Sequence, residues 1–140
     1  MATYRLKNNE LPMDDTWDVV IAGGGPSGCA AAIAAAREGA RTLLVEGTGM
    51  LGGMGTSGLI PAWARFSDRE RMVHRGIAEQ VFNASNATLY KPHPGQLDWV
   101  KINVEALKRI YDEMVTGAGA TVLFNTTMTA VELSRPGCVD

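Results

Sequence analysis

The chain has 140 residues, of which 46% are hydrophobic and 20% charged, so it has the size and composition of one ordinary globular domain. Its 13 Lys and Arg against 15 Asp and Glu leave a formal net charge of −2, which excludes the basic surface typical of nucleic-acid partners. No apolar run approaches the roughly 20 residues that span a bilayer, so we expect no membrane partner.

Residues 1–16 form a polar lead without the apolar segment or cleavage site of a secretory signal. We therefore place the folded domain at 17–140 and expect a cytoplasmic protein. The two cysteines, Cys29 and Cys138, form no C-x-x-C motif. Their pattern predicts small buried thiols, with neither a dithiol redox pair nor a metal site.

The first elements form a β-α-β unit. The β-branched run 18–22 (DVVIA) predicts a strand that is buried on both faces of a parallel sheet. The alanine-rich segment 26–38 predicts a helix with a proline in its first turn, and Gly39 suits its C-terminal end. The run 41–46 (RTLLVE) predicts a second buried strand, which a right-handed crossover would place beside the first.

The next elements are a long loop and an amphipathic helix. Residues 47–58 hold six glycines in twelve positions, which predicts a loop without helical or alternating periodicity. Residues 68–83 predict a helix, because apolar side chains recur on one face. This apolar stripe consists of Met72, Val73, Ile77 and Val81. Residues 84–99 are interrupted by prolines and predict irregular structure.

The last part of the chain predicts a helix and two extended segments. Asn103 can cap a helix that runs to Met114 or Val115, with glycines directly after it. Residues 120–124 (ATVLF) predict a third strand, and 125–133 (NTTMTAVEL) predict a second extended stretch. The order of elements indicates a doubly wound parallel sheet that begins with the β-α-β unit and is left incomplete.

A glycine motif joins the first predicted strand to the first helix. Gly23-x-Gly25-x-x-Gly28 has the spacing of a dinucleotide-binding turn and stands in the strand-turn-helix context that this motif needs. Gly23 would allow the sharp exit from the strand, Gly25 the approach of a diphosphate to the backbone, and Gly28 close packing of helix on strand. The diphosphate would then bind at the N-terminus of the helix that opens at Pro26.

Glu46, at the end of the second strand, is placed where a carboxylate can accept hydrogen bonds from a ribose 2′-hydroxyl. The same charge would repel a 2′-phosphate and so disfavours NADP. The glycine-dense loop that follows offers bare amides and the hydroxyls of Thr56 and Ser57 to a second phosphate and a polyol chain, as FAD requires. A nicotinamide-binding half would place a helix soon after Glu46 instead. Together these residues predict an α/β, Rossmann-like FAD/NAD(P)-binding fold.

The chain resembles the FAD-dependent oxidoreductases of the two-dinucleotide-binding-domain type, which have a glutathione-reductase-like Rossmann fold. The resemblance rests on DVVIAGGGPSGCAAAIAAAREGARTLLVE and MLGGMGTSGLIP, and more weakly on NVEALKRIYDEM and ATVLFNTTMTAVEL. It implies that Gly23, Gly25 and Gly28 meet the FAD pyrophosphate and that Glu46 holds the adenosine ribose. It also implies that Gly53 and Thr56 lie along the phosphate-ribityl-flavin path, and that backbone near Met128 meets the adenine.

The family's later flavin-contacting segment and substrate domain have no counterpart before Asp140, so we expect the N-terminal part of a longer enzyme. The expected function is flavin-mediated hydride or electron transfer on a small-molecule substrate. An NAD-binding dehydrogenase half and a non-catalytic nucleotide-binding module remain alternatives. The candidate cofactor-binding residues are Gly23, Gly25, Pro26, Ser27, Gly28, Glu46, Gly52, Gly53, Thr56, Ser57 and Met128.

No catalytic acid or base is identified from the sequence. His74 and His93 fit solvated or capping roles better than catalysis, although histidine titrates near neutral pH. Trp63, Arg65 and Phe66 follow the glycine loop, where they could reach a flavin edge or a substrate anion or form an ordinary amphipathic turn.

Overall fold

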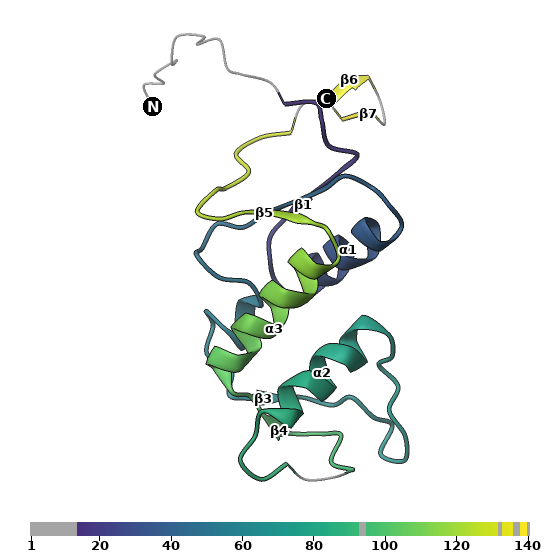
Figure 1. Ribbon diagram of the computed structural model, residues 1–140, viewed down its shortest axis with the longest axis vertical. Coiled ribbons are helices and arrows are strands. Elements are labelled where there is room, and N and C mark those ends of the chain that lie inside the picture. Colours follow the sequence, from purple (N-terminus) through teal and green to yellow (C-terminus); the bar gives the residue numbers. More distant parts are fainter. Residues whose placement is uncertain (1–13, 93–94, 132, 136–137, 140) are drawn as a thin grey trace, which may run out of the picture.

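The computed structural model describes residues 14–92, 95–131, 133–135 and 138–139. Its centre is a three-stranded parallel sheet in the order β1-β2-β5, formed by Val19–Ala22, Thr42–Val45 and Thr121–Leu123. Three helices accompany the sheet, α1 (Pro26–Arg37), α2 (Ile77–Ala87) and α3 (Val104–Gly117), as Figure 1 shows. The predicted parallel sheet with a β-α-β start is therefore confirmed.

The β-α-β unit forms where the sequence predicts it. Strands β1 and β2 are in register from Val19 opposite Thr42 to Ala22 opposite Val45. Helix α1 begins with a proline, whose missing N–H is not needed in the first turn, and Gly39 follows its end with a φ of +87°. Asp18 directly precedes β1, and Arg41 directly precedes β2. The two side chains form a salt bridge, with 2.7 Å between Asp18 Oδ1 and Arg41 Nη2.

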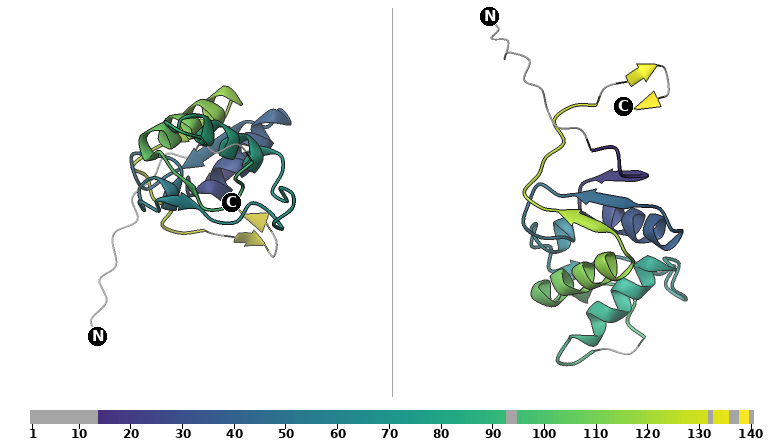
Figure 2. Two further views of the ribbon diagram at one scale, coloured as in Figure 1. Left: turned by 90° about the horizontal axis from the view of Figure 1, so that it is seen from below. Right: turned by 45° about the horizontal axis from the view of Figure 1, so that its top comes forward.

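In the part of the chain that the structure describes, the helices cover one face of the sheet. Helix α1 packs against β1, β2 and α3, and α3 packs against β5 and α2, so the helices stack on one side of the strands (Figure 2). The prediction that the first strand is buried on both faces is wrong, because Val20, on the opposite face, is 60% exposed. The core lies under the helices and consists of Cys29, Ala32, Ile33, Leu44, Leu51, Val81, Leu107, Tyr111, Val115 and Ala120.

The predicted helix at 68–83 is wrong in its first half. Helix α2 begins only at Ile77, so Met72, Val73 and His74 precede it. The Asp68 carboxylate accepts hydrogen bonds from the N–H groups of Glu70 and Arg71, and this local turn competes with helical pairing. Gly76, with a φ of +69°, then interrupts the backbone directly before α2. The Asp68 turn and the backbone of Gly76 therefore prevent a helix at 68–76, despite the helix propensity and the apolar stripe.

The sequence pattern does not predict three short elements that the structure contains. The loop 47–58 contains a 3-10 turn, η1, at Gly53–Gly55. Strand β3 (Ala62–Trp63) pairs antiparallel with β4 (Val100–Lys101). Two-residue strands are too short for alternation to be read in sequence.

The extended stretch predicted at 125–133 is only partly present. Residues 125–131 form no strand, because the backbone after β5 follows residues 46–48 instead: Asn125 donates to the carbonyl of Thr48, and Thr126 to that of Glu46. Strand β6 (Leu133–Arg135) begins at the end of the stretch and pairs antiparallel with β7 (Cys138–Val139). Among the described residues, no helix is both long and apolar enough to cross a bilayer.

Helix α3 has a side-chain cap that can be tested. The Asn103 side chain accepts a hydrogen bond from the Ala106 N–H at 3.2 Å, as the sequence predicts. We expect Asn103→Ala to lower the free energy of unfolding by about 1 kcal/mol, because one N–H of the first turn loses its partner. Urea denaturation of Asn103→Ala and Asn103→Asp measures this. Asp can cap as Asn does, so equal loss in both variants would contradict the capping role.

Candidate cofactor-binding site

The turn between β1 and α1 depends on a very close approach of two glycines. A Cβ on Gly28 would overlap the carbonyl oxygen of Gly23 and lie 3.0 Å from its carbonyl carbon. The N–H of Gly23 donates to the carbonyl of Val45 at 2.7 Å, which fixes the turn at the ends of both strands. Because it has no side chain, Gly28 allows helix α1 to pack closely against strand β1. This is the role of the third glycine in the motif.

The N-terminus of α1 is open. Gly25 is the capping residue, and no side chain of the described residues caps the helix with a hydrogen bond. The first N–H groups of a helix have no partner within it, so those of Ser27 and Gly28 can serve an external acceptor. A Cβ on Gly25 would have no atom within 4 Å, so the space beside this glycine is free. An anion that enters this space meets backbone amides at the positive end of the helix dipole.

The carboxylate of Glu46 is turned toward this same turn. Its Oε2 accepts a hydrogen bond from the Gly24 N–H at 2.7 Å, and its Oε1 accepts two from Thr48, through the N–H and the hydroxyl, each at 2.7 Å. Burial raises the pKa of Glu46, but these three hydrogen bonds outweigh that effect and hold the pKa below its ordinary value. Glu46 is therefore an ionised acceptor at the edge of the glycine turn.

Gly24 joins the two glycine loops and was not among the residues predicted from the sequence. Its carbonyl accepts hydrogen bonds from the Gly52 N–H at 2.8 Å and from the Cys29 thiol at 3.2 Å. The loops also touch beside it, since a Cβ on Gly53 would lie 3.1 Å from the Cα of Gly25. The motif G-x-G-x-x-G treats Gly24 as variable, so its spacing carries no signal for this residue. The two glycine loops therefore lie side by side.

The hydroxyls of Thr56 and Ser57 both donate to carbonyls within the second loop. Thr56 is 1% exposed, and its hydroxyl donates to the carbonyl of Leu51 at 2.6 Å. The hydroxyl of Ser57, although exposed, donates to the carbonyl of Gly53 at 3.1 Å. The Thr56 hydroxyl thus donates to a buried carbonyl, and a contact of Thr56 with the cofactor stays a prediction. Thr56 shapes the loop, while the backbone of Gly53 remains beside the first glycine turn.

The segment after β5 reaches the site, but through residues before Met128. Asn125 and Thr126 make the backbone hydrogen bonds to residues 46–48 described above, and a Cβ on Gly47 would lie 3.3 Å from the Thr127 hydroxyl. Met128 follows these residues and is 57% exposed. The backbone at 125–127 thus lies beside the Glu46 end of the site. A contact of Met128 with adenine stays a prediction.

Other residues singled out in the sequence have structural roles. Trp63 donates its Nε1–H to Ser85 at 3.2 Å and packs edge-on against Phe66. His74 is exposed and contacts the Phe66 ring, with 5.2 Å between centroids. Burial raises the pKa of the Cys29 thiol to about 11, so this cysteine is a packed thiol, as expected. His93 lies outside the described residues.

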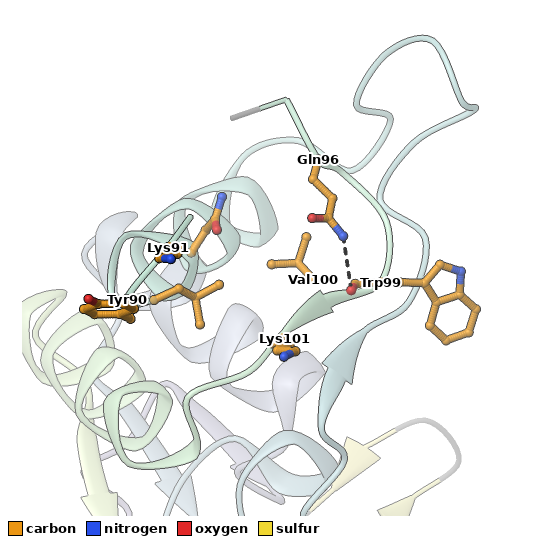
Figure 3. Close-up of a pocket in the computed structure, with 8 residues that line it drawn as sticks. Tyr90, Lys91, Gln96, Trp99, Val100 and Lys101 are labelled. Atoms are coloured by element: carbon orange, nitrogen blue, oxygen red, sulfur yellow. Dashed lines mark hydrogen bonds between the residues drawn. The ribbon is translucent and has the colours of Figure 1, made fainter. Parts of the chain in front are cut away.

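A separate hollow of about 420 Å³ lies between the end of α2 and β4. Figure 3 shows Tyr90 and Lys91 on one side of it and the Trp99 side chain pointing away. Its polar groups are partly used within the chain: the Lys91 ammonium lies 5.7 Å from the Tyr90 ring centroid, and the Gln96 amide donates to the carbonyl of Asp98. None of the predicted cofactor-binding residues lines this hollow. The glycine turn, and not this hollow, carries the features of a dinucleotide site.

A parallel β-α-β unit with a glycine turn, an open helix N-terminus and a carboxylate at the end of the second strand defines a Rossmann-like dinucleotide-binding protein. The family model described as FAD dependent oxidoreductase matches residues 18–139. The chain belongs to this family, whose cofactor is FAD.

Three solved structures have a similar fold. They are THI4 from Thermovibrio ammonificans (21% identity, TM-score 0.59), a geranylgeranyl bacteriochlorophyll reductase-like protein from Thermoplasma acidophilum (17%, 0.51), and CabE, an aromatic hydroxylase from angucycline biosynthesis (19%, 0.53). The matches cover 85%, 88% and 86% of this chain but only 42%, 33% and 26% of those chains, respectively. The chain thus spans less than half the length of each of these proteins.

The residues present fit one end of an FAD molecule. The space beside Gly25 would be narrowed by any Cβ, and the adjoining helix amides suit a diphosphate. The Glu46 carboxylate suits ribose hydroxyls, because it is ionised and lies at the same turn. No described side chain occupies the space beside Gly25 within 4 Å of where its Cβ would be. The amide donors thus suit the diphosphate, and the carboxylate acceptor suits the ribose beside it in an adenosine diphosphate group.

Proposed function

We propose that this chain forms the adenosine-diphosphate end of the FAD site in an oxidoreductase that acts on a small-molecule substrate. In this proposal the amides at the start of α1, those of Ser27 and Gly28, bind the diphosphate, and the carboxylate of Glu46 binds the adenosine ribose. Pro26 sets the first turn, and the backbone of Gly52 and Gly53 borders the path toward the flavin. FAD, when bound, supplies hydride or electron transfer, while these residues supply placement and electrostatics.

One observation supports the proposal most strongly: the Glu46 carboxylate accepts the Gly24 N–H at 2.7 Å inside the glycine turn. A carboxylate at a strand end is usually free in solvent, whereas this one is fixed beside the open helix N-terminus. The arrangement brings an acceptor for ribose and donors for phosphate to a single turn. An adenosine diphosphate carries both groups in the matching order.

The nicotinamide alternative predicts a crossover helix soon after Glu46. Residues 47–52 form no helix, and only the three-residue turn η1 follows at Gly53–Gly55 before β3. This arrangement favours FAD over NAD, in agreement with the family. A cytoplasmic setting is also part of the proposal, and the free thiol of Cys29 suits a reducing compartment.

Ligand titration of the purified chain tests the proposal. We expect FAD and ADP to bind competitively in calorimetry, because both carry the adenosine diphosphate group, and FMN not to compete with ADP. NAD serves as the comparison for the nicotinamide alternative. Failure of both FAD and ADP to bind would overturn the proposal, and tighter binding of NAD than of FAD would overturn the choice of cofactor.

A further inference from the structure

Thr48 has no place in the glycine motif, yet it donates two hydrogen bonds to the Glu46 carboxylate, whereas Gly24 donates one. Both its N–H and its hydroxyl donate to the same oxygen, Oε1, at 2.7 Å. Among the described residues, the other oxygen, Oε2, accepts a hydrogen bond only from the Gly24 N–H. A carboxylate offers about four acceptor positions, two on each oxygen. Thr48 thus fills both positions on Oε1, and one position is left on Oε2, beside Gly24.

Thr48 is itself held in place from two directions. Its carbonyl accepts the Asn125 N–H at 3.1 Å, and the neighbouring carbonyl of Glu46 accepts the Thr126 N–H at 3.0 Å. On its other side, the Thr48 hydroxyl lies 3.1 Å from the carbonyl of Met50 and 3.4 Å from its nitrogen. The threonine is therefore a fixed point between the end of β2 and the segment after β5. A fixed donor can hold a carboxylate in a single orientation.

We infer that Thr48 is a positioning residue for nucleotide binding: it occupies Oε1 of Glu46 and so presents Oε2 to one ribose hydroxyl at the glycine turn. This inference rests on the proposed function, since it assigns to Thr48 the orientation of the group that would bind the ribose. Thr48 does not contact the nucleotide in this arrangement. Its effect on nucleotide binding depends on Glu46 alone. Combining Thr48 variants with ADP analogues that lack one ribose hydroxyl can detect this dependence.

The hydrogen bonds from Thr48 also affect the charge of Glu46. Removal of the Thr48 hydroxyl takes away one of the hydrogen bonds that hold the pKa of Glu46 below its ordinary value, so that pKa rises. Nucleotide binding through an ionised carboxylate is lost as the pH falls through the pKa of Glu46. As the pH is lowered, a variant without this hydroxyl is therefore expected to lose nucleotide binding at a higher pH than the wild type. We call this pH the acidic limit of binding.

The test compares Thr48→Val, Thr48→Ser and the wild type in their binding of ADP, 2′-deoxy-ADP and 3′-deoxy-ADP by calorimetry. We expect the wild type to discriminate against one deoxy analogue, because a single acceptor position faces the ribose. Thr48→Val should bind ADP roughly tenfold more weakly, the effect of about one hydrogen bond to a charged group, and lose most of this discrimination. Thr48→Ser keeps the hydroxyl and should bind as the wild type does.

Thr116→Val is the matched control, because Thr116 is also exposed and also hydrogen-bonded through its hydroxyl, but to Asp112 within α3. It should bind ADP as the wild type does. Thr48→Ala repeats the test should Thr48→Val fail to fold, and the pH dependence of ADP binding gives a second readout. Unchanged ADP affinity and an unchanged acidic limit in the Thr48 variants would overturn the inference.

Glu46→Ala separates this inference from the proposed function. Weak ADP binding in Glu46→Ala together with normal binding in Thr48→Val would overturn the role of Thr48 and leave the ribose contact standing. Normal ADP binding in Glu46→Ala would overturn the ribose contact itself, and with it the role of Thr48. Weaker binding in both variants, with rescue by serine, supports both.

Discussion

Gly28→Ala is expected to lower the free energy of unfolding by at least about 3 kcal/mol, and FAD binding should be lost together with the fold. The added Cβ would overlap the carbonyl oxygen of Gly23, and this neighbour is backbone rather than the end of a flexible side chain. The clash can be relieved only if α1 moves away from β1. Such a movement would open the core around Cys29 and Ile33, which are fully buried on α1.

Gly25→Ala is the matched variant, with one methyl added three residues earlier. The backbone at Gly25 is extended, with a φ of −70°, and the added Cβ would meet no atom within 4 Å. Stability should change by less than about 1 kcal/mol. The methyl would stand where the diphosphate must approach, so FAD affinity should fall at least about 100-fold. Thermal denaturation and FAD titration measure the two effects. Tight FAD binding by folded Gly25→Ala would place the diphosphate elsewhere.

The second large effect is expected from Glu46→Ala. The variant removes the acceptor proposed for the ribose and leaves the buried N–H of Gly24 without its partner. FAD affinity should fall roughly 10- to 100-fold, and the free energy of unfolding should fall by about 1–3 kcal/mol, the cost of an unsatisfied buried donor. Calorimetry with FAD and ADP, and urea denaturation, measure the two losses separately.

Glu105→Ala is the control for Glu46→Ala. Glu105 is an exposed carboxylate in the first turn of α3, paired with Lys108 at 2.7 Å. Exposed pairs of this kind contribute little to stability, so this variant should keep both its fold and its affinity for FAD. Glu46→Gln adds a further comparison, because it keeps the shape of the side chain without its charge. FAD affinity in Glu46→Gln equal to that of the wild type would argue against an ionised acceptor.

The geometry of the candidate site, a glycine turn beside a strand-end carboxylate, was largely predictable because its signals are local. Gly23, Gly25 and Gly28 are required by a single turn, and their spacing can be read within six residues. Glu46 follows from the length of one helix and one strand. The contacts of Gly24 and Thr48 were not predictable, because neither residue belongs to the motif. Gly24 meets Glu46 from another segment, and Thr48, two residues after Glu46, is held by Asn125 from the segment after β5.

The segment at 68–76 shows a different reason for failure. Its apolar spacing continues that of α2, but the Asp68 turn and the backbone of Gly76 end the helix at Ile77. The direction of the Thr56 hydroxyl also depended on tertiary structure. A threonine in a glycine-rich loop can face solvent or turn inward, and the nearby carbonyl of Leu51 selects the inward direction.

The sequence by itself determined the β-α-β unit, the glycine turn and the class of ligand, because these depend on backbone geometry and residue spacing within short segments. Only the tertiary structure decided which sheet face is covered and how Glu46 is oriented. Orientation depends on two donors: the Gly24 N–H, which reaches the carboxylate because β1 lies beside β2, and Thr48, which lies two residues after Glu46. Burial of a strand face depends on where the helices pack, and an apolar strand has the same sequence pattern whether one face is covered or both.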